Sequence, residues 1–297
     1  MSIIKTEHLS KFYGKARGVA DLSLKIEKGE CFGFIGPNGA GKSTTIRMLM
    51  QLIFPTSGNF WLFEQIIKGE NPALRRRIGY IPSEINYYQE LTGRQLLELG
   101  AKLYEVGTEN IAPYAELLEL DLSKTVKSYS LGNRKKLGII QSLLHDPELL
   151  ILDEPTSGLD PLIQHRFFQL LKEKNRQGLT IFLSTHVLSE IEKFCHRVGL
   201  IRAGKLINLS SVEDLPGRAE RIVEVTYSEE GDLRKPYGLS QIDPAVRYQD
   251  GRHIFHVKEH LHKALAIIAQ HPIADIIIKQ PTLEELFMKY YGQREEE

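Results

Sequence analysis

The chain has 297 residues, enough for one large domain and a second small one that each bury a hydrophobic core. Its 38 lysines and arginines balance its 38 aspartates and glutamates, which excludes a net field that attracts nucleic acid or anionic lipid, and no nucleic-acid partner is expected. The two cysteines, Cys31 and Cys195, exclude a disulfide framework. The longest uncharged stretch, residues 48–63, is interrupted by Pro55 and polar residues, so nothing approaches the roughly 18 apolar residues of a membrane span.

The N-terminal part predicts antiparallel strands, then a buried strand and a helix. Residues 2–9 and 18–30 alternate apolar and polar side chains between glycines, which is typical of antiparallel strands. Residues 31–35, CFGFI, form a continuous apolar run and predict a buried strand. After a glycine-rich turn, apolar residues recur at helical spacing and predict a helix; they are Ile46, Leu49, Met50 and Ile53.

The middle of the chain predicts a helical insert followed by more strands of a parallel sheet. From about residue 84 to 145, leucines recur three and four residues apart, which indicates helices. Residues 148–156, ELLILDEPT, predict a buried strand, and Asp160 with Pro161 predicts the start of the next helix. A further strand, TIFLSTH, follows. Strands that alternate with helices indicate a parallel sheet covered on both faces, with ligands beyond the carboxyl ends of its strands.

The pattern changes at Leu-Pro-Gly, residues 215–217, and we expect a domain boundary there. Residues 1–215 form the first predicted domain, and residues 216–297 predict a small α+β domain of mixed strand-like and helix-like segments. The last predicted helix has an apolar face that favours the core of this domain, with a docking face as the alternative. That face consists of Leu283, Leu286, Phe287 and Tyr290.

The segment IGPNGAGKST, residues 35–44, predicts a phosphate-binding loop. It fits G-x-x-x-x-G-K-[ST], with the strand before it and the helix after it that this motif requires. Backbone N–H groups of such a loop surround phosphate oxygens, Lys42 reaches the β and γ phosphates, and Ser43 is a magnesium ligand. The alternative, a purely structural glycine turn, is disfavoured by the flanking elements. The predicted nucleotide-binding residues are Gly36, Asn38, Gly39, Ala40, Gly41, Lys42, Ser43 and Thr44.

Two adjacent carboxylates, Asp153 and Glu154, end the predicted strand 148–156. At this place the aspartate is predicted to hold a magnesium-bound water and the glutamate to face an attacking water. Neighbouring residues on a strand point to opposite faces, but a turn at its end redirects both. The alternative, that both cap the following turn, is disfavoured because Asp160 already serves the next helix. No Asn-Lys-x-Asp sequence for guanine recognition is present, which disfavours a GTPase.

Further motifs make the chain resemble the nucleotide-binding subunit of an ATP-binding-cassette (ABC) transporter. They are YSLGNRKK at 129–136, Tyr13 in SKFYG, SGLD at 157–160 and His186 in LSTH, in the family's order. The resemblance covers roughly residues 2–215, and the C-terminal domain resembles the extension of the multidrug and antibiotic-export (ABC-2 type) group. It implies an α/β P-loop NTPase fold with an antiparallel β subdomain and a helical insert, a small C-terminal α+β domain, and ATP and Mg²⁺ as cofactors.

The resemblance also implies roles for single residues. Tyr13 would stack on adenine, with an ordinary half-buried tyrosine as the alternative. Glu154 would polarise the attacking water, and Asp153 would bind Mg²⁺ through a water. His186 would hold the γ phosphate and help to position the attacking water. Without its place after the strand TIFLS, His186 would be interpreted as a structural histidine.

The family's signature, normally Leu-Ser-Gly-Gly-Gln, is Tyr-Ser-Leu-Gly-Asn at 129–133. Ser130, Gly132 and Asn133 would bind in trans a phosphate of ATP held by a second subunit, because the following helix points its positive end at that phosphate. A plain helix cap is a compatible interpretation, since capping and phosphate binding use the same helix end. The family also has a magnesium-reaching glutamine where this chain has Ser83, whose side chain is too short without an intervening water.

One copy of each motif does not complete a site, so the resemblance implies a dimer, of this chain or with a related one, that encloses ATP. ATP binding would close the pair and hydrolysis would release it, and this cycle would drive a separate integral membrane permease subunit of an exporter. The chain would then be a peripheral subunit at the cytoplasmic face of the cell membrane. The alternatives are a soluble ABC ATPase of repair, translation or cofactor assembly, and a regulator that binds ATP without turnover.

Overall fold

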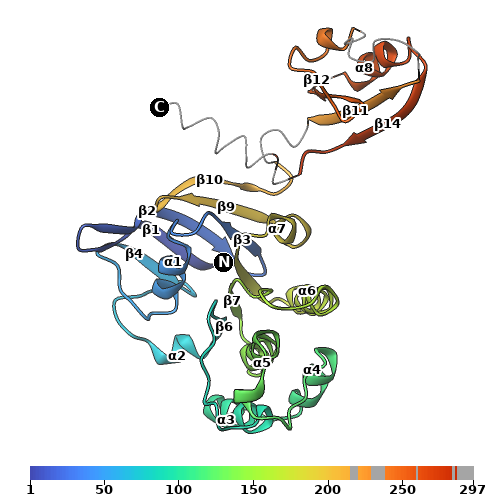
Figure 1. Cartoon of the computed structure of the whole chain (residues 1–297). Coiled ribbons are helices and arrows are strands. Elements are labelled where there is room, and N and C mark those ends of the chain that lie inside the picture. The colour runs from blue at the N-terminus through green and yellow to red at the C-terminus, as the bar shows by residue number, and fades with distance from the viewer. Residues whose placement is uncertain (215–219, 229–237, 259, 283–284, 286–297) are drawn as a thin grey trace. The chain divides into compact units, whose positions relative to one another are not determined.

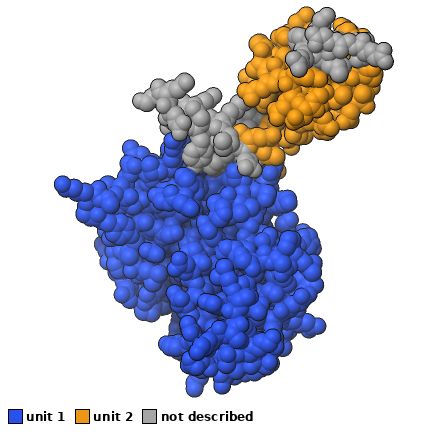
Figure 2. Space-filling model, viewed as in Figure 1, with its two compact units in different colours: residues 1–212 blue, residues 213–297 orange. Residues whose placement is uncertain are grey.

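The computed structural model of the chain divides into two compact units, residues 1–212 and 213–297 (Figure 1 and Figure 2). The sequence-based domain boundary, between residues 215 and 216, lies close to this division. The predicted final helix with Leu283, Leu286, Phe287 and Tyr290 lies outside the described residues. The structure describes residues 1–214, 220–228, 238–258, 260–282 and 285.

A largely parallel sheet forms the centre of the first unit, with the strand order β10-β9-β3-β8-β7-β6. Within residues 1–214, the pair β9–β10 is the antiparallel pair of this sheet. Every residue of β3, β7 and β8 is buried, as expected for parallel strands covered on both faces. The strands are β3 Cys31–Ile35, β6 Ile78–Ile81, β7 Leu149–Asp153, β8 Thr180–Thr185, β9 Arg197–Arg202 and β10 Lys205–Ser211.

An antiparallel sheet with the order β2-β1-β4-β5 packs against the same core. Leu22 and Phe60 come from this sheet, Ile46 from α1, and Phe34 and Phe182 from the parallel sheet, and all are fully buried in one hydrophobic cluster. The two sheets therefore hold α1 between them. The elements are β1 Ser2–Tyr13, β2 Ala16–Glu27, α1 Lys42–Leu49, β4 Ser57–Leu62 and β5 Gln65–Ile66.

Helix α1 is shorter than its apolar spacing predicts. It ends at Leu49, because Gln51 adopts a left-handed conformation with a φ of 57°. Ile53, predicted on the apolar face of this helix, therefore lies beyond it, and its half-buried side chain still packs against the core. The apolar spacing therefore predicted correctly that Ile53 packs against the core, but it wrongly predicted a further helical turn after Leu49.

The predicted helical insert contains α3, α4 and α5. Thr92 and Gln95 exchange side-chain to backbone hydrogen bonds of 3.2 and 2.9 Å at the start of α3, a capping box. Asp160 caps α6 through the N–H of Ile163 at 3.0 Å, with Pro161 at the first helical position as predicted. The helices are α2 Pro72–Arg75, α3 Gly93–Tyr104, α4 Ile111–Leu117, η1 Val126–Ser128, α5 Leu131–Leu143, α6 Pro161–Arg176 and α7 Leu188–Phe194.

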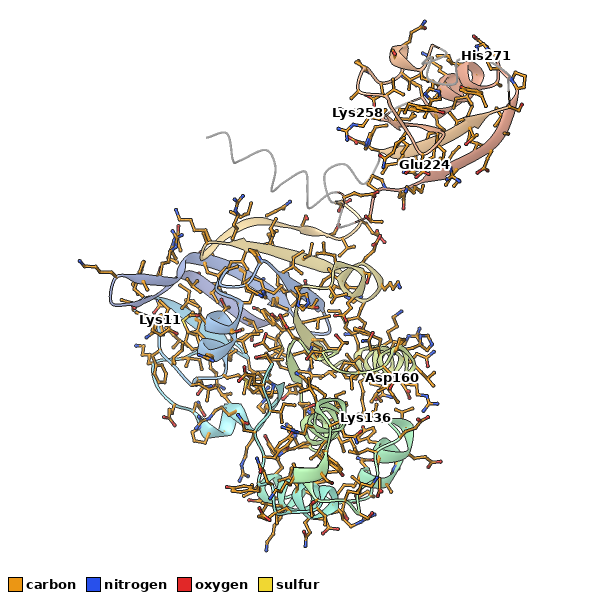
Figure 3. The ribbon with its side chains drawn as sticks, in the orientation of Figure 1. Lys11, Lys136, Asp160, Glu224, Lys258 and His271 are labelled. Atoms are coloured by element: carbon orange, nitrogen blue, oxygen red, sulfur yellow. The ribbon has the colours of Figure 1, made fainter. Side chains whose placement is uncertain are left out.

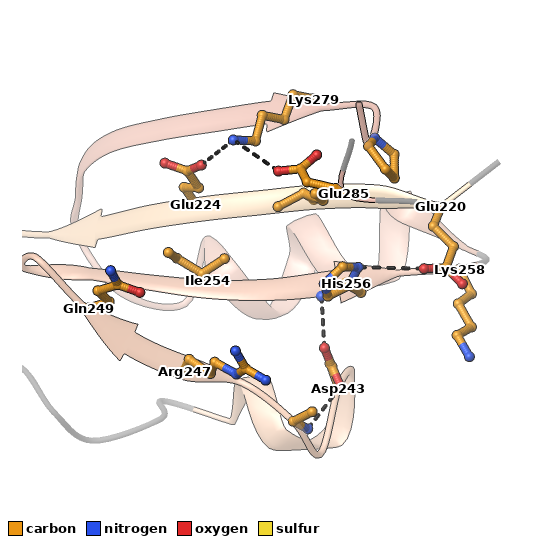
Figure 4. A pocket seen from close by; sticks show the side chains of 13 residues that line it. Glu220, Glu224, Asp243, Arg247, Gln249, Ile254, His256, Lys258, Lys279 and Glu285 are labelled. Carbon is orange, nitrogen blue, oxygen red and sulfur yellow. Dashed lines mark hydrogen bonds and ion pairs between the residues drawn. The ribbon is translucent and has the colours of Figure 1, made fainter. Parts of the chain in front are cut away.

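The second unit is an antiparallel sheet, β12-β13-β11-β14, with a helix on one face. Val223, Phe255 and Ile268 belong to the core between the sheet and α8. The other face carries charged side chains around a pocket of about 890 Å³ (Figure 4). This arrangement confirms the predicted α+β class. Its elements are β11 Arg221–Tyr227, η2 Leu239–Gln241, β12 Arg247–Gln249, β13 Arg252–Val257, α8 Leu261–Ile268 and β14 Ile273–Lys279.

Candidate nucleotide-binding site

The predicted phosphate-binding loop lies between the end of β3 and the start of α1. Gly41 has a φ of 110°, which glycine adopts without strain, and a Cβ there would lie 2.5 Å from the carbonyl oxygen of Gly18. A Cβ on Gly36 would lie 2.2 Å from the carbonyl oxygen of Ile201. Glycine is therefore required at both ends of the loop. Of the other predicted members, Asn38 and Gly39 are exposed, Ala40 is buried and Thr44 is half-buried.

Lys42, the first residue of α1, is buried and bends back over this loop. Its Nζ donates hydrogen bonds to the carbonyl oxygens of Gly36 at 2.6 Å and Pro37 at 3.1 Å. Burial lowers the pKa of its ammonium, and the carboxylates of Glu154 and Asp153 oppose that shift. A phosphate beside this ammonium would offset the cost of burying its charge.

Ser43 and Asp153 meet where α1 begins and β7 ends. The Ser43 hydroxyl donates to Oδ2 of Asp153 at 3.1 Å. Asp153 is 3% exposed, and this burial raises the pKa of its carboxyl while the Ser43 hydroxyl opposes the shift. These oxygens fit Mg²⁺, which proteins usually hold through one or two oxygen side chains plus substrate phosphates. The described residues contain no cluster of three or more histidine, cysteine or acidic side chains suited to a metal.

Glu154 and His186 also meet at this edge of the sheet. Nδ1 of His186, directly after β8, lies 3.0 Å from Oε1 of Glu154, directly after β7. Glu154 has a φ of 50°, a left-handed conformation that turns it out of the strand, and its N–H donates to the carbonyl oxygen of Ser184 at 2.8 Å. This turn is how neighbouring carboxylates of one strand both reach the edge where the phosphate-binding loop lies.

Tyr13 lies at the end of β1 with 47% of its surface exposed. A Cβ on Gly18 would lie 3.0 Å from both the Tyr13 ring and the Thr44 methyl group, so these side chains flank the same glycine. Nζ of Lys11 lies 5.6 Å from the centre of the ring. The structure therefore places an exposed aromatic ring beside the phosphate-binding loop.

The signature-like segment forms the start of α5. Oγ of Ser130 accepts a hydrogen bond from the N–H of Asn133 at 3.2 Å, which makes Ser130 the helix N-cap. A Cβ on Gly132 would lie 2.5 Å from the carbonyl oxygen of Gly158, so the SGLD turn contacts this helix end. Among the described residues, no hydrogen bond joins Ser130, Gly132 or Asn133 to the phosphate-binding loop.

Ser83 follows β6 and is exposed, and the structure shows no hydrogen bond from its side chain in the described part of the chain. It is not brought to the Ser43–Asp153 pair. The preceding residue, Pro82, is instead bound through its carbonyl oxygen by Nζ of Lys135, at 2.9 Å. Magnesium binding by Ser83 stays a prediction.

The sequence analysis did not single out two buried charged residues near this edge. Glu190 of α7 accepts a hydrogen bond of 2.6 Å from Thr156, just after Glu154. Glu190 belongs to α7, which begins at Leu188, and no motif used in the sequence analysis includes it. Lys135 is fully buried in α5 and had no comparable signal, because a pair of lysines is typical of a solvated surface.

Comparisons with known proteins agree with this geometry. Residues 19–157 match the family described as "ABC transporter", and residues 125–192 match an AAA domain family described as a putative AbiEii toxin. The bacitracin transport ATP-binding protein BcrA of Bacillus licheniformis is 37% identical over 98% of both chains. The linearmycin resistance ATP-binding protein LnrL of Bacillus subtilis is 31% identical over 98% of this chain and 99% of its own.

A solved structure of an ATP-binding subunit of an ABC transporter is 30% identical, with a TM-score of 0.68 over 72% of this chain and 91% of its own. It confirms the predicted P-loop fold of the first unit. None of the helices formed by the described residues is long and apolar enough to cross a membrane. Since relatives of more than 30% identity align over nearly the whole length, the chain belongs to the family of ATP-binding subunits of ABC transporters, which are ATPases.

Proposed function

We propose that this chain hydrolyses ATP at the carboxyl ends of β7 and β8 and thereby drives a separate membrane subunit of an exporter. The observation that carries the proposal is the meeting of two pairs at one edge of the sheet: Ser43 with Asp153, and Glu154 with His186. This edge is where open parallel sheets bind ligands. The first pair is suited to a phosphate with its metal, and the second to a water that attacks that phosphate.

Each residue of the edge has a defined task in this proposal. Lys42 would neutralise the β and γ phosphates. Ser43 directly and Asp153 through a water would hold Mg²⁺, which would supply positive charge against the phosphate oxygens. Glu154 accepts a proton from the attacking water, and His186 fixes the Glu154 carboxylate at 3.0 Å and contacts the γ phosphate. Tyr13 stacks on adenine from the rim of the loop.

The same proposal places the helix end at Ser130 against the ATP of a second subunit. Ser130 is exposed and lies next to the SGLD turn, and no contact joins it to the phosphate-binding loop of its own chain in the described residues. In this proposal, the N–H groups at the start of α5 would bind the phosphate of ATP held by the other subunit. A pair of subunits, identical or related, would complete each site.

A groove of about 490 Å³ beside Pro82 supports docking of a membrane permease subunit. Tyr80 of β6, Tyr87 of the following loop, and Leu103 with Tyr104 of α3 line it, together with polar residues that include Arg75 and Arg76. Aromatic and aliphatic walls are suited to an apolar segment of another protein. The bacitracin-transport and linearmycin-resistance relatives support an exporter. Because ATP is supplied from the cytoplasm, the chain would lie at the cytoplasmic face of the membrane.

Replacement of Glu154 by glutamine tests the catalytic part. Glu154→Gln is expected to lower turnover by roughly 10²–10⁴-fold, the loss expected of a missing general base, with ATP affinity retained. Light scattering should then show a stable dimer in ATP, because the closed pair is not released. Glu173→Gln, an exposed carboxylate of α6, is the matched control. Near-normal hydrolysis by Glu154→Gln would remove Glu154 from this role.

Co-purification tests the membrane part. A tagged chain purified from detergent-solubilised membranes should carry with it a protein with several membrane spans, identified by mass spectrometry. Recovery of the chain without such a partner, together with intact ATPase activity, would favour the soluble ABC ATPase of repair, translation or cofactor assembly.

A further inference from the structure

Lys135 is a fully buried lysine in the first unit, five residues after Ser130 on α5. Lysine side chains are rarely buried completely unless their charge has a partner. The structure shows one hydrogen bond from its Nζ in the described residues, to the carbonyl oxygen of Pro82 at 2.9 Å. Pro82 directly follows β6 and directly precedes Ser83, the residue that replaces the family's glutamine.

The register of the sheet brings this contact to the catalytic edge. Ile81 pairs with Leu152 between the parallel strands β6 and β7, so the next residues, Pro82 and Asp153, lie side by side at the ends of these strands. Burial lowers the pKa of Lys135 to about 8, and the carboxylates of Asp153 and Glu154 oppose that shift. The buried ammonium is thus within electrostatic reach of both carboxylates.

The loop after Pro82 also packs directly on α5. A Cβ on Gly138, one helical turn after Lys135, would lie 2.8 Å from Cδ1 of Ile85 and 2.9 Å from the hydroxyl of Tyr87. The lysine and the glycine therefore lie on one face of α5, and loop 82–87 covers that face. Lys135, on the helix that begins at Ser130, therefore bonds this loop at Pro82 and lies within electrostatic reach of the carboxylates at the end of β7.

We propose that Lys135 is a positioning residue for ATP hydrolysis, which fixes the start of loop 82–87 between α5 and the carboxylates at the end of β7. Ser83 is exposed and makes no contact with these carboxylates in the described residues, so Lys135 provides the link between the catalytic edge and this loop. This proposal rests on the proposed function, which assigns ATP hydrolysis to these carboxylates and assigns to Ser130 a phosphate held by a second subunit.

The first experiment separates binding from turnover. Lys135→Met keeps the volume of the aliphatic stem and removes a buried charge, so the melting temperature should be retained. ATP affinity should change by less than about threefold, because Lys135 does not contact the phosphate-binding loop. The turnover number should fall at least about tenfold, since small displacements of a catalytic edge cost up to about a hundredfold. Near-normal turnover would overturn the proposal.

Two further variants test the mechanism. Lys135→Gln restores a hydrogen-bond donor without the charge and should recover turnover to within about threefold of the wild type. Lys136→Met is the matched control, because Lys136 lies on the same helix, α5 (Figure 3), and is also buried. Its Nζ donates instead to the carbonyl oxygen of Glu119 at 3.5 Å, so turnover should be normal. Equal losses in Lys135→Gln and Lys135→Met, or in Lys136→Met and Lys135→Met, would overturn the proposal.

A Ser130→Ala variant distinguishes failure of this proposal from failure of the proposed function. Full turnover by Ser130→Ala would overturn the site shared between two subunits, whatever Lys135→Met does. Loss of turnover in Ser130→Ala together with normal turnover in Lys135→Met would overturn the positioning role alone.

Discussion

The catalytic edge of the first unit and the open sheet face of the second unit both collect charged residues, but in different ways. On the second unit, Glu224 lies 2.8 Å from Nζ of Lys279 (Figure 4). It also lies 3.1 Å from the guanidinium of Arg252. In the first unit, Lys42 and Asp153 are both more than 90% buried, yet no salt bridge joins them in the described structure. Their hydrogen-bond partners are carbonyl and hydroxyl groups.

This difference shows what identifies a ligand site in this chain. Burying a charge without a direct ion pair is costly, so the first unit carries a cost that a charged ligand removes. The charges of the second unit neutralise one another at the surface, where each pair contributes little. The pocket on the second unit is large, at about 890 Å³, but volume alone does not indicate a ligand.

The largest expected effect is at Lys42, whose buried charge distinguishes the first unit from the second. Lys42→Ala should weaken ATP binding at least about 100-fold, because the phosphate-binding loop loses the ammonium that the phosphates of ATP would contact. Isothermal titration with ATP measures this change, and Lys172→Ala, an exposed lysine of α6, is the control. Unchanged affinity in Lys42→Ala would refute the phosphate-binding loop.

A smaller effect is expected at Gly132, which changes no charge. A Cβ there would lie 2.5 Å from the carbonyl oxygen of Gly158, so Gly132→Ala must displace the SGLD turn or the start of α5. Turnover should fall roughly tenfold to a hundredfold, while ATP affinity of the single subunit is kept. Gly69→Ala is the matched control, since no atom lies within 4 Å of a Cβ at that position. Equal turnover in both variants would contradict a role for this helix end.

The same contrast explains how much the sequence alone predicts. The phosphate-binding loop, the strand before Asp153 and the cap at Asp160 depend on residues close together in the chain, and short motifs locate them. The contact between Glu154 and His186 was predicted only as a shared role, because it also requires β7 and β8 to be neighbours in the sheet.

The sequence patterns did not predict which lysine of α5 faces Pro82, where α1 ends, or the edge strand β12. Lys135 and Lys136 are adjacent and alike in type, and only the packing of α5 decides which one faces Pro82. The left-handed conformation at Gln51 that ends α1 follows no residue-type rule, since glutamine is not typical there. In the second unit, β12 was not predicted because Arg247–Gln249 is short and exposed, and its pairing with β13 defines it.

The smallest expected effect is at Glu224, on the charge-balanced face. Hydrogen bonds from Lys279, the larger cause, and from Arg252 hold the pKa of this carboxyl below its ordinary value of 4.5. Their contribution to stability is therefore present above pH 4.5, and it is lost as the pH falls through the lower pKa of the folded state. Glu224→Gln should lower the free energy of unfolding of the second unit by less than about 1 kcal/mol at pH 7 and leave ATP turnover unchanged.

Calorimetry of the full chain at pH 7 and at pH 3 checks this, with Asp250→Asn as the control because Asp250 makes no ion pair in the described part of the second unit. The difference between wild type and Glu224→Gln should shrink toward zero in acid and in high salt, since protonation and screening both remove the pairing. A loss of ATP turnover in Glu224→Gln would contradict the comparison, because it would give the charge-balanced face a part in catalysis that its paired charges do not indicate.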